Sequence, residues 1–170
     1  ILSLGAQAAA FGVIGRDETG DRLYEYLHSA GARVDGVVKL ADRITTAKTR
    51  VLAGNQQVVR VDREDTSPIS TETVGALKEH LRRSIDQGAL QAIILEDYAK
   101  GVLTADLAAE LVELGHVNGL IVALDPHPSH PFELHGLDLM TPNRAEAFAL
   151  AGLYYQPGSL PLSEDKALLE

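Results

Sequence analysis

The residues whose types and spacing best fit chemistry lie where three short apolar runs end: Asp97 and Lys100, then Asp125, then Asn143 and Glu146. The runs that precede them read as strands, over Leu90–Leu95, Leu120–Leu124 and Leu137–Met140. In an open α/β sheet, ligands bind just beyond the carboxyl ends of the strands. We therefore expect these carboxylates, the amide and the ammonium group to form one site, built from loops that are far apart in the sequence.

A second polar group occupies residues 44–62, where charged and apolar side chains alternate. A period of two predicts strands, and the turn residues in the middle predict a β-hairpin. A two-residue loop, Gly54-Asn55, would pair Lys48 with Val61, whereas a three-residue loop beginning at Ala53 pairs Lys48 with Arg60. We favour the longer loop, because a slip of one residue would mix the two faces. One face then holds every charge, from Lys48, Arg50, Arg60 and Asp62, and the other holds Val51, Val59 and Val61.

The remaining elements alternate between helix and strand. Apolar spacing of three and four predicts helices over Asp21–Ala30, Thr71–Asp86, Thr104–Leu114 and Asn143–Ala151. Further strands are expected over Ala8–Ile14 and Val34–Leu40, and a last helix from Ser163. This order implies a parallel sheet with right-handed crossovers, into which the hairpin is inserted. At 170 residues the chain suffices for one α/β domain.

The amino-acid composition limits the classes of binding partner that the chain is expected to have. The 24 acidic residues outnumber the 15 basic ones, and the net charge of −9 argues against general nucleic-acid or anionic-membrane binding. The sequence has no run of 18 apolar residues, so no membrane span is predicted. Cysteine is absent, which excludes disulfides and fits a reducing compartment, so a cytoplasmic location is expected. Apart from Glu133, no nearby carboxylate stands at ligand spacing from His127, His130 and His135, so we interpret these histidines as loop residues rather than as a metal site.

Five motifs carry a family resemblance across nearly the whole chain. They are Gly15-Arg-Asp-Glu-Thr-Gly20, Thr46-Ala-Lys-Thr-Arg50, Asn55-Gln-Gln-Val-Val-Arg-Val-Asp62, Asp97-Tyr-Ala-Lys-Gly101 and Thr141-Pro-Asn-Arg-Ala-Glu146. Together they resemble the ribokinase-like (PfkB) carbohydrate kinases, and among these the D-glycero-D-manno-heptose 7-phosphate kinases. The resemblance implies a partial three-layer sandwich around a parallel sheet, spanning residues 1–170, with the hairpin 44–62 as a lid.

The resemblance also implies an activity, cofactors and roles. The activity is transfer of the γ-phosphoryl group of ATP to the anomeric hydroxyl of heptose 7-phosphate, with Mg²⁺, in the synthesis of a lipopolysaccharide precursor. Lys48, Arg50, Arg60, Asp62, Asp97 and Lys100 would bind the substrate. Asp125, Asn143 and Glu146 would organise nucleotide phosphate and Mg²⁺, mostly through water rather than as direct metal ligands. Paired lids imply a homodimer.

Two departures from the family pattern qualify this expectation. The Gly-Ala-Gly-Asp motif, which carries the catalytic base, is absent from the 170 residues, so no catalytic residue is assigned and this piece alone is expected to be inactive. His127 follows Asp125-Pro126 where the heptose kinases have lysine. Another PfkB sugar kinase, of the ribose or fructose type, and a non-catalytic sugar-phosphate-binding or dimerisation fragment therefore remain as alternatives.

Each group also has a purely structural interpretation. The hairpin charges fit a solvated face. Asp97 and Lys100 fit a salt bridge in a loop. Asn143 followed three residues later by Glu146 fits a capping box at the start of a helix.

Overall fold

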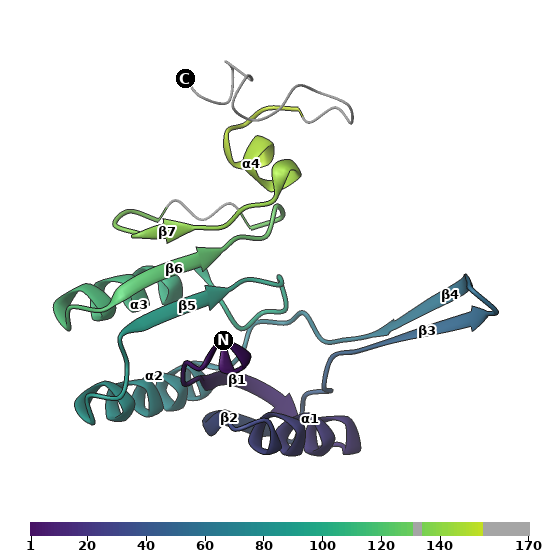
Figure 1. Cartoon of the computed structure of the whole chain (residues 1–170), viewed down its shortest axis with the longest axis horizontal. Helices are drawn as coiled ribbons and strands as arrows, with labels where there is room; N and C mark the ends of the chain where they lie inside the picture. The colour runs from purple at the N-terminus through teal and green to yellow at the C-terminus, as the bar shows by residue number, and fades with distance from the viewer. Residues whose placement is uncertain (131–133, 155–170) are drawn as a thin grey trace. The chain divides into compact units, whose positions relative to one another are not determined.

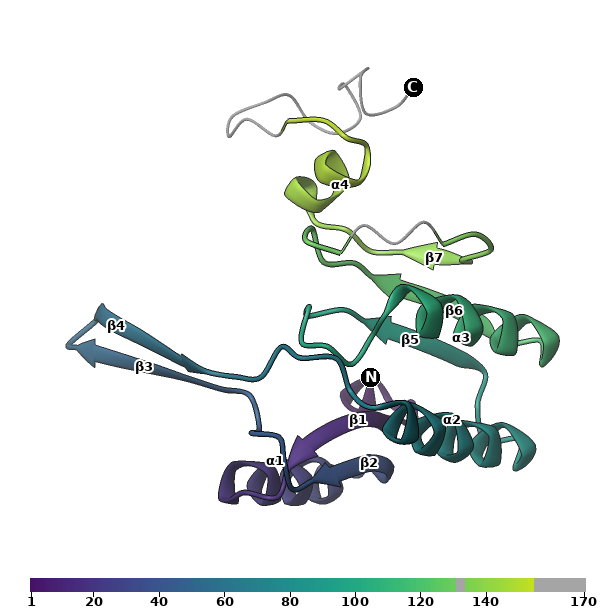
Figure 2. The ribbon, with the colours of Figure 1, turned by 180° about the vertical axis from the view of Figure 1, so that it is seen from behind.

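The computed structural model describes residues 1–130 and 134–154. The chain divides into two compact units (Figures 1 and 2). The first comprises Ile1–Ala89 with Lys100–Val102, and the second comprises Leu90–Ala99 with Leu103–Glu170. No helix among the described residues is long and apolar enough to cross a membrane.

The first unit is built on two parallel strands, β1 (Ala9–Gly15) and β2 (Arg33–Leu40), joined by helix α1 (Glu18–Ser29). A single 3₁₀ turn, η1 (Leu2–Leu4), precedes them, and helix α2 (Thr71–Asp86) packs against both strands. Ile14 and Val34 from the strands, and Leu77 and Leu81 from α2, are buried in its core. Leu77 and Leu81 belong to the apolar stripe that predicted α2, whose bounds match the prediction.

The hairpin, strands β3 (Ala47–Ala53) and β4 (Gln56–Arg63), corrects the predicted register. The loop has two residues, because Ala53 pairs with Gln56, and a bulge interrupts the register between Val51 and Leu52, where β4 holds one extra residue. Lys48 therefore lies opposite Asp62 rather than Arg60, and the three-residue loop was wrong.

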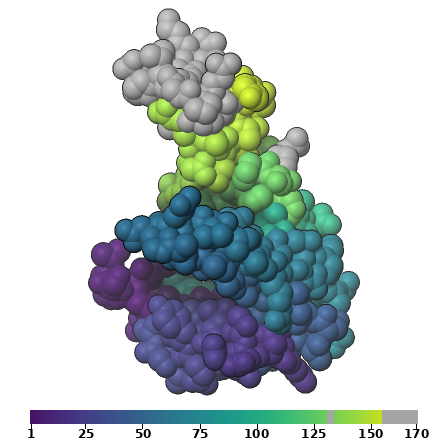
Figure 3. Space-filling model, turned by 90° about the vertical axis from the view of Figure 1, so that its right-hand side faces the viewer, coloured from purple at the N-terminus to yellow at the C-terminus, as the bar shows by residue number. Residues whose placement is uncertain are grey.

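The predicted faces nevertheless survive the change of register. The bulge adds one residue to β4. From Ala47 to Val51, the residue of β4 that lies opposite each β3 residue is two positions later than predicted. A shift of two keeps a side chain on its own face. Arg50 pairs with Arg60, and Val51 pairs with Val59. All eight residues of β4 are exposed, and Figure 3 shows the hairpin in blue on the face turned to the viewer.

The second unit is a parallel sheet in the order β5-β6-β7, formed by Ala92–Glu96, Ile121–Asp125 and Leu139–Met140. Helix α3 (Ala105–Val117) makes the crossover from β5 to β6, and helix α4 (Arg144–Leu150) follows β7. Thr104 caps α3, as predicted, by accepting a hydrogen bond from the Leu107 amide. Val122 and Leu124 are almost fully buried, whereas Ile94 and Ile121 are about half exposed. The α3 side of this sheet therefore carries its core.

The parallel strands, their helical crossovers and the antiparallel hairpin confirm the predicted α/β class. Helix α1 begins at Glu18, three residues before the predicted start, because Asp17 caps it. The predicted apolar face of α1 is not buried, since Leu23 is 39% and Tyr26 is 72% exposed. The predicted helix from Ser163, and most of the loop before it, lie outside the described residues.

Candidate functional site

Asp97 lies immediately beyond β5 and is the most enclosed of the predicted site residues, with a side chain only 2% exposed. Its Oδ1 accepts a hydrogen bond of 2.8 Å from the Ala99 amide, and its Oδ2 lies 3.2 Å from Nδ1 of His130. Ala99 has a positive φ of 51°, a conformation unusual for a residue other than glycine. The turn after β5 is therefore organised around the Asp97 carboxylate, and in this conformation both carboxylate oxygens are engaged.

The strand ends of the second unit do converge, as the sequence predicted. The Asp97 amide donates to the Asp125 carbonyl at 3.0 Å, and the Asp125 carboxylate accepts a 3.1 Å hydrogen bond from the Thr141 hydroxyl. Glu96 lies opposite Asp125 in the register of β5 and β6. This edge of the sheet thus gathers carboxylates from two neighbouring strands.

The negative charge at this edge changes the pKa of Tyr98. Its hydroxyl lies 3.5 Å from Glu96 Oε2. The charge of Glu96, with smaller contributions from burial and from Asp125, raises the pKa of Tyr98 above its usual value of 10.0. Tyr98 therefore stays protonated over the whole neutral range and remains a hydrogen-bond donor at this edge.

Asn143 and Glu146 form the predicted capping box at the start of α4. Asn143 Oδ1 accepts from the Glu146 amide at 3.1 Å, and Glu146 Oε2 accepts from the Asn143 amide at 2.7 Å. The structural interpretation of this pair is therefore confirmed. The capping contacts do not bury the pair, since Asn143 is exposed, so contacts through water remain open to both side chains.

On the charged face of the hairpin, Asp62 neutralises two of the three cations. It lies 3.4 Å from Lys48 Nζ and 3.0 Å from Arg60 Nε. Within the part of the chain that the structure describes, Arg50 has no hydrogen bond or ion pair, and its side chain is exposed. The four predicted residues thus share one face, and Arg50 is the cation on it whose charge is not compensated.

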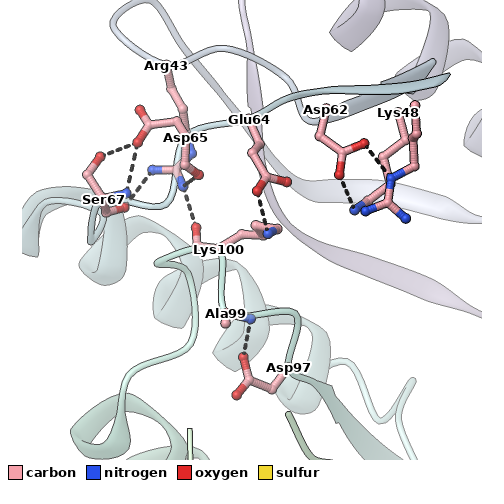
Figure 4. A network of polar contacts seen from close by, with 10 residues as sticks. Arg43, Lys48, Asp62, Glu64, Asp65, Ser67, Asp97, Ala99 and Lys100 are labelled. Carbon is pink, nitrogen blue, oxygen red and sulfur yellow. Dashed lines mark hydrogen bonds and ion pairs between the residues drawn. The ribbon is translucent and has the colours of Figure 1, made fainter. Parts of the chain in front are cut away.

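Lys100 belongs to the first unit, where its ammonium group lies 2.9 Å from Glu64 Oε1 (Figure 4). Glu64 follows directly after β4 and was not predicted as a site residue. Asp97 belongs to the second unit, so the predicted joint action of Asp97 and Lys100 stays a prediction. The sequence gives no signal for this pair, because Lys100 and Glu64 are 36 positions apart.

Arg43 connects the base of the hairpin to the turn that contains Lys100. Its guanidinium donates to the Ser67 and Asp65 carbonyls at 3.0 Å each, and also to the Lys100 carbonyl (Figure 4). Arg43 precedes the hairpin, and Asp65 and Ser67 follow it, so one side chain ties both ends of the hairpin to the Lys100 turn. The planar fork of arginine suits such multiple contacts better than lysine does.

Asp17 forms a second anchor at the base of the hairpin. Its carboxylate accepts from the Gly20 amide at 2.8 Å and the Thr45 amide at 2.9 Å, and it lies 3.3 Å from Arg63. Gly20 is required here, since a Cβ would lie 2.3 Å from the Gly15 carbonyl oxygen. The Gly-Arg-Asp-Glu-Thr-Gly motif therefore has a structural function as a helix start that holds the hairpin.

The loop histidines His127 and His130 make local contacts. Among residues 1–130 and 134–154, no group of three or more histidine, cysteine, aspartate and glutamate side chains has an arrangement that could hold a metal ion. His127 accepts from the Ser129 amide, and His130 contacts Asp97.

Comparison with known proteins gives the context for this geometry. The sequence pattern of the pfkB family carbohydrate kinases matches residues 1–156. The chain belongs to the pfkB family. It is 36% identical over 153 residues to the bifunctional protein HldE of Geobacter sulfurreducens, and 39% identical over 153 residues to that of Gluconobacter oxydans. These matches cover 90% and 89% of this chain but 31% of each relative, so the chain spans about a third of their length.

Solved structures agree on the fold. A carbohydrate kinase from Agrobacterium tumefaciens superposes with a TM-score of 0.68 at 22% identity, covering 87% of this chain and 48% of that one. The tetrameric inhibited form of phosphofructokinase-2 from Escherichia coli gives 0.64 at 18% identity, with 91% and 50% covered. At these identities the likeness shows the shared fold of pfkB kinases, and this chain corresponds to about half of such a kinase.

Proposed function

We propose that this chain forms the sugar-phosphate-binding part of a kinase that phosphorylates heptose 7-phosphate at its anomeric hydroxyl. The observation that carries the proposal is the identity of 36% to 39% with bifunctional HldE proteins over nine-tenths of the chain. The heptose kinase motifs fall on the polar groups described above, the charged hairpin face and the edge of the β5-β6-β7 sheet.

Arg50 is the residue proposed to bind the substrate's phosphate on the hairpin. Among the cations of the charged hairpin face, the ion pairs favour Arg50 for this contact, because Asp62 already neutralises Lys48 and Arg60. Arginine also offers a bidentate contact to phosphate. Asp97 is proposed to accept hydrogen bonds from sugar hydroxyls after its contact with His130 opens.

ATP and Mg²⁺ are the proposed cofactors. Bound together, they supply the phosphoryl group and neutralise the charge that develops on it. Oxygen ligands suit Mg²⁺, which usually keeps several waters. The carboxylates of Asp125 and Glu146 and the amide of Asn143 fit such water-mediated contacts. Their oxygens accept hydrogen bonds from Thr141 and within the capping box, and each oxygen can accept a further one from water.

Binding specificity tests the proposal. Isothermal titration of the 170-residue chain with heptose 7-phosphate, ribose 5-phosphate and fructose 6-phosphate should show the tightest binding for the heptose. Arg50→Gln should weaken that binding about tenfold or more, while Arg82→Gln, a matched change on the exposed side of α2, should leave it unchanged. Preference for ribose or fructose phosphate would instead favour a kinase of another sugar, the possibility that His127 raises.

A second candidate function is self-association through the hairpin. Val51, Val59 and Val61 are 47%, 45% and 54% exposed on its uncharged face. Exposed apolar residues grouped on one face are typical of interaction sites. We propose a homodimer through this face, which is compatible with sugar-phosphate binding by the opposite face.

A further inference from the structure

The ion pair between Lys100 and Glu64 has two features that a solvated surface pair lacks. Both side chains are about three-quarters buried, with exposed fractions of 26% and 25%. In addition, Glu64 Oε2 is buried without any hydrogen-bond partner among the described residues. A partly buried carboxylate with one oxygen unsatisfied depends strongly on its remaining partner, because an unpaired buried charge is costly.

Arg43 fixes the distance between the two partners through the backbone. It donates to the Asp65 carbonyl, one residue after Glu64, and to the carbonyl of Lys100 itself. The turn is tightened further by Gly101, which has a φ of 70° and whose absent Cβ would lie 2.0 Å from the Ser67 carbonyl oxygen. The pair is thus set by the backbone and does not merely reflect two flexible side chains that happen to meet.

This arrangement affects how Lys100 could receive an anion. Paired with Glu64, the ammonium group offers no net positive charge to an approaching phosphate. If Lys100 turns toward phosphate, Glu64 Oε1 loses its donor while Oε2 already has none. The exchange is favourable only if the incoming ligand also supplies a hydrogen-bond donor to Glu64, and a hydroxyl group is such a donor.

We propose that Glu64 is a specificity-determining residue that makes Lys100 select polyhydroxylated phosphates over simple anions. A sugar phosphate presents its phosphate to Lys100 and a hydroxyl to the oxygen that Lys100 leaves. Sulfate, which carries no hydroxyl group near neutral pH, can satisfy Lys100 but offers Glu64 no donor and meets it with repulsion. This inference rests on the proposed function, because it takes a sugar phosphate as the substrate and Lys100, in addition to Arg50, as a residue that binds its phosphate.

Two binding constants for each variant test it. The 170-residue chain is titrated with heptose 7-phosphate and with sulfate. Glu64→Gln keeps the shape of the side chain but removes its charge, so sulfate should bind about threefold or more tighter and heptose 7-phosphate about threefold or more weaker. The dissociation constant for sulfate divided by that for heptose 7-phosphate should therefore fall about tenfold. Glu64→Asp, which keeps the charge, should retain most of the selectivity, and Glu25→Gln in α1 is the matched control.

The ion pair itself is checked without any ligand, by the rate of reductive methylation of Lys100 followed by mass spectrometry. Loss of the carboxylate in Glu64→Gln should raise that rate severalfold, and Glu25→Gln should not change it. An unchanged rate would overturn the inference. If the unaltered chain binds heptose 7-phosphate and Glu64→Gln keeps the same selectivity, the inference alone fails. If the unaltered chain does not bind heptose 7-phosphate, the proposed function fails and takes the inference with it.

Discussion

The carboxylate of Asp17 accepts a hydrogen bond of 2.9 Å from the backbone amide of Thr45, 28 residues further along the chain. Thr45 makes a second contact with the loop that contains Asp17, because its buried hydroxyl accepts a hydrogen bond from the Gly15 amide at 2.8 Å. The first strand end and the start of the hairpin are therefore held to each other by side-chain-to-backbone contacts. This relationship explains why a motif at residues 15–20 matters for an element that begins at Ala47.

Asp17 should make the stability of the chain depend on acid pH. Hydrogen bonds from the amides of Thr45 and Gly20, and then the Thr45 hydroxyl, lower the pKa of Asp17 below its usual 3.8, and Arg63 adds a smaller contribution. A lowered pKa in the folded state stabilises the fold above the unfolded value. That stabilisation is present above about pH 4 and is lost as pH falls through the lowered pKa.

Asp17→Asn should therefore lower the unfolding temperature at pH 7 and flatten its decline below about pH 4, as followed by circular dichroism. Hydrogen bonds donated by the Ser67 hydroxyl and amide lower the pKa of Asp65 in the same way, so part of the acid dependence should remain in this variant. Asp86→Asn, at the end of α2, is the control. An acid limb of unaltered steepness in Asp17→Asn would contradict the assignment.

Arg43→Lys should destabilise the chain although it keeps the charge. Lysine has no planar fork, so contacts to the Asp65, Ser67 and Lys100 carbonyls cannot all be kept. We expect a loss of about 2 kcal/mol in the free energy of unfolding by urea, in line with one to two hydrogen bonds to a charged group. Faster hydrogen exchange at the Ile69 amide, which donates to Gly101, should accompany it. Arg82→Lys, if equally destabilising, would refute a special role for Arg43.

Two glycine substitutions should act in opposite directions. Gly101→Ala puts a side chain at a positive φ and against the Ser67 carbonyl, so we expect a destabilisation of about 2 kcal/mol or more. Gly75 lies within α2, and a Cβ there would meet nothing within 4 Å. Gly75→Ala should therefore stabilise the chain by up to about 1 kcal/mol through helix propensity. Urea unfolding of both variants decides the matter, and an equal effect on each would show that the local geometry is wrong.

Tyr98 should titrate at a higher pH than an ordinary tyrosine. The charge of Glu96 is the main cause of its raised pKa, so Glu96→Gln should move the pKa back toward 10.0, whereas Glu113→Gln on α3 should leave it in place. The raised pKa means that the folded state holds this proton more tightly than the unfolded state. Its contribution to stability is complete below about pH 10 and is lost as pH rises through the raised value. Titration of the ring resonances by NMR measures the shift.

The sequence predicted best what local periodicity controls. Thr71–Asp86 is a helix because its apolar stripe is a local pattern, and the capping box of Asn143 and Glu146 spans only four residues. The hairpin register failed because a bulge depends on the fit between two strands, which no single-strand pattern encodes. Periodicity likewise defined the apolar face of α1 but could not tell whether anything covers it.

The candidate site divides in the same way. Asp97, Asp125 and Asn143 were predicted because each lies at or after the end of a strand, and strand ends of a parallel sheet share an edge. Arg43, Glu64 and Thr45 were missed because their partners lie 22 to 57 residues away, and those of Arg43 and Thr45 are backbone carbonyls and amides or groups next to them. The signal that pointed toward them was the density of polar residues on both sides of the hairpin, which reads equally well as a solvated loop.

Charge placed on the apolar hairpin face should separate self-association from ligand binding. Val59 and Val51 lie opposite each other on that face, and both are about half exposed, so Val59→Asp should cost the folded monomer little. In a dimer through this face the new carboxylate would be buried without a partner, a cost of several kcal/mol. Sedimentation velocity should show a dimer for the unaltered chain and a monomer for Val59→Asp.

Thr49→Asp, opposite Val61 on the same face, should also give a monomer, whereas Lys78→Asp on α2 should leave the dimer intact. Heptose 7-phosphate binding should survive Val59→Asp, because Arg50 is on the other face, and its loss would show that association and binding depend on each other.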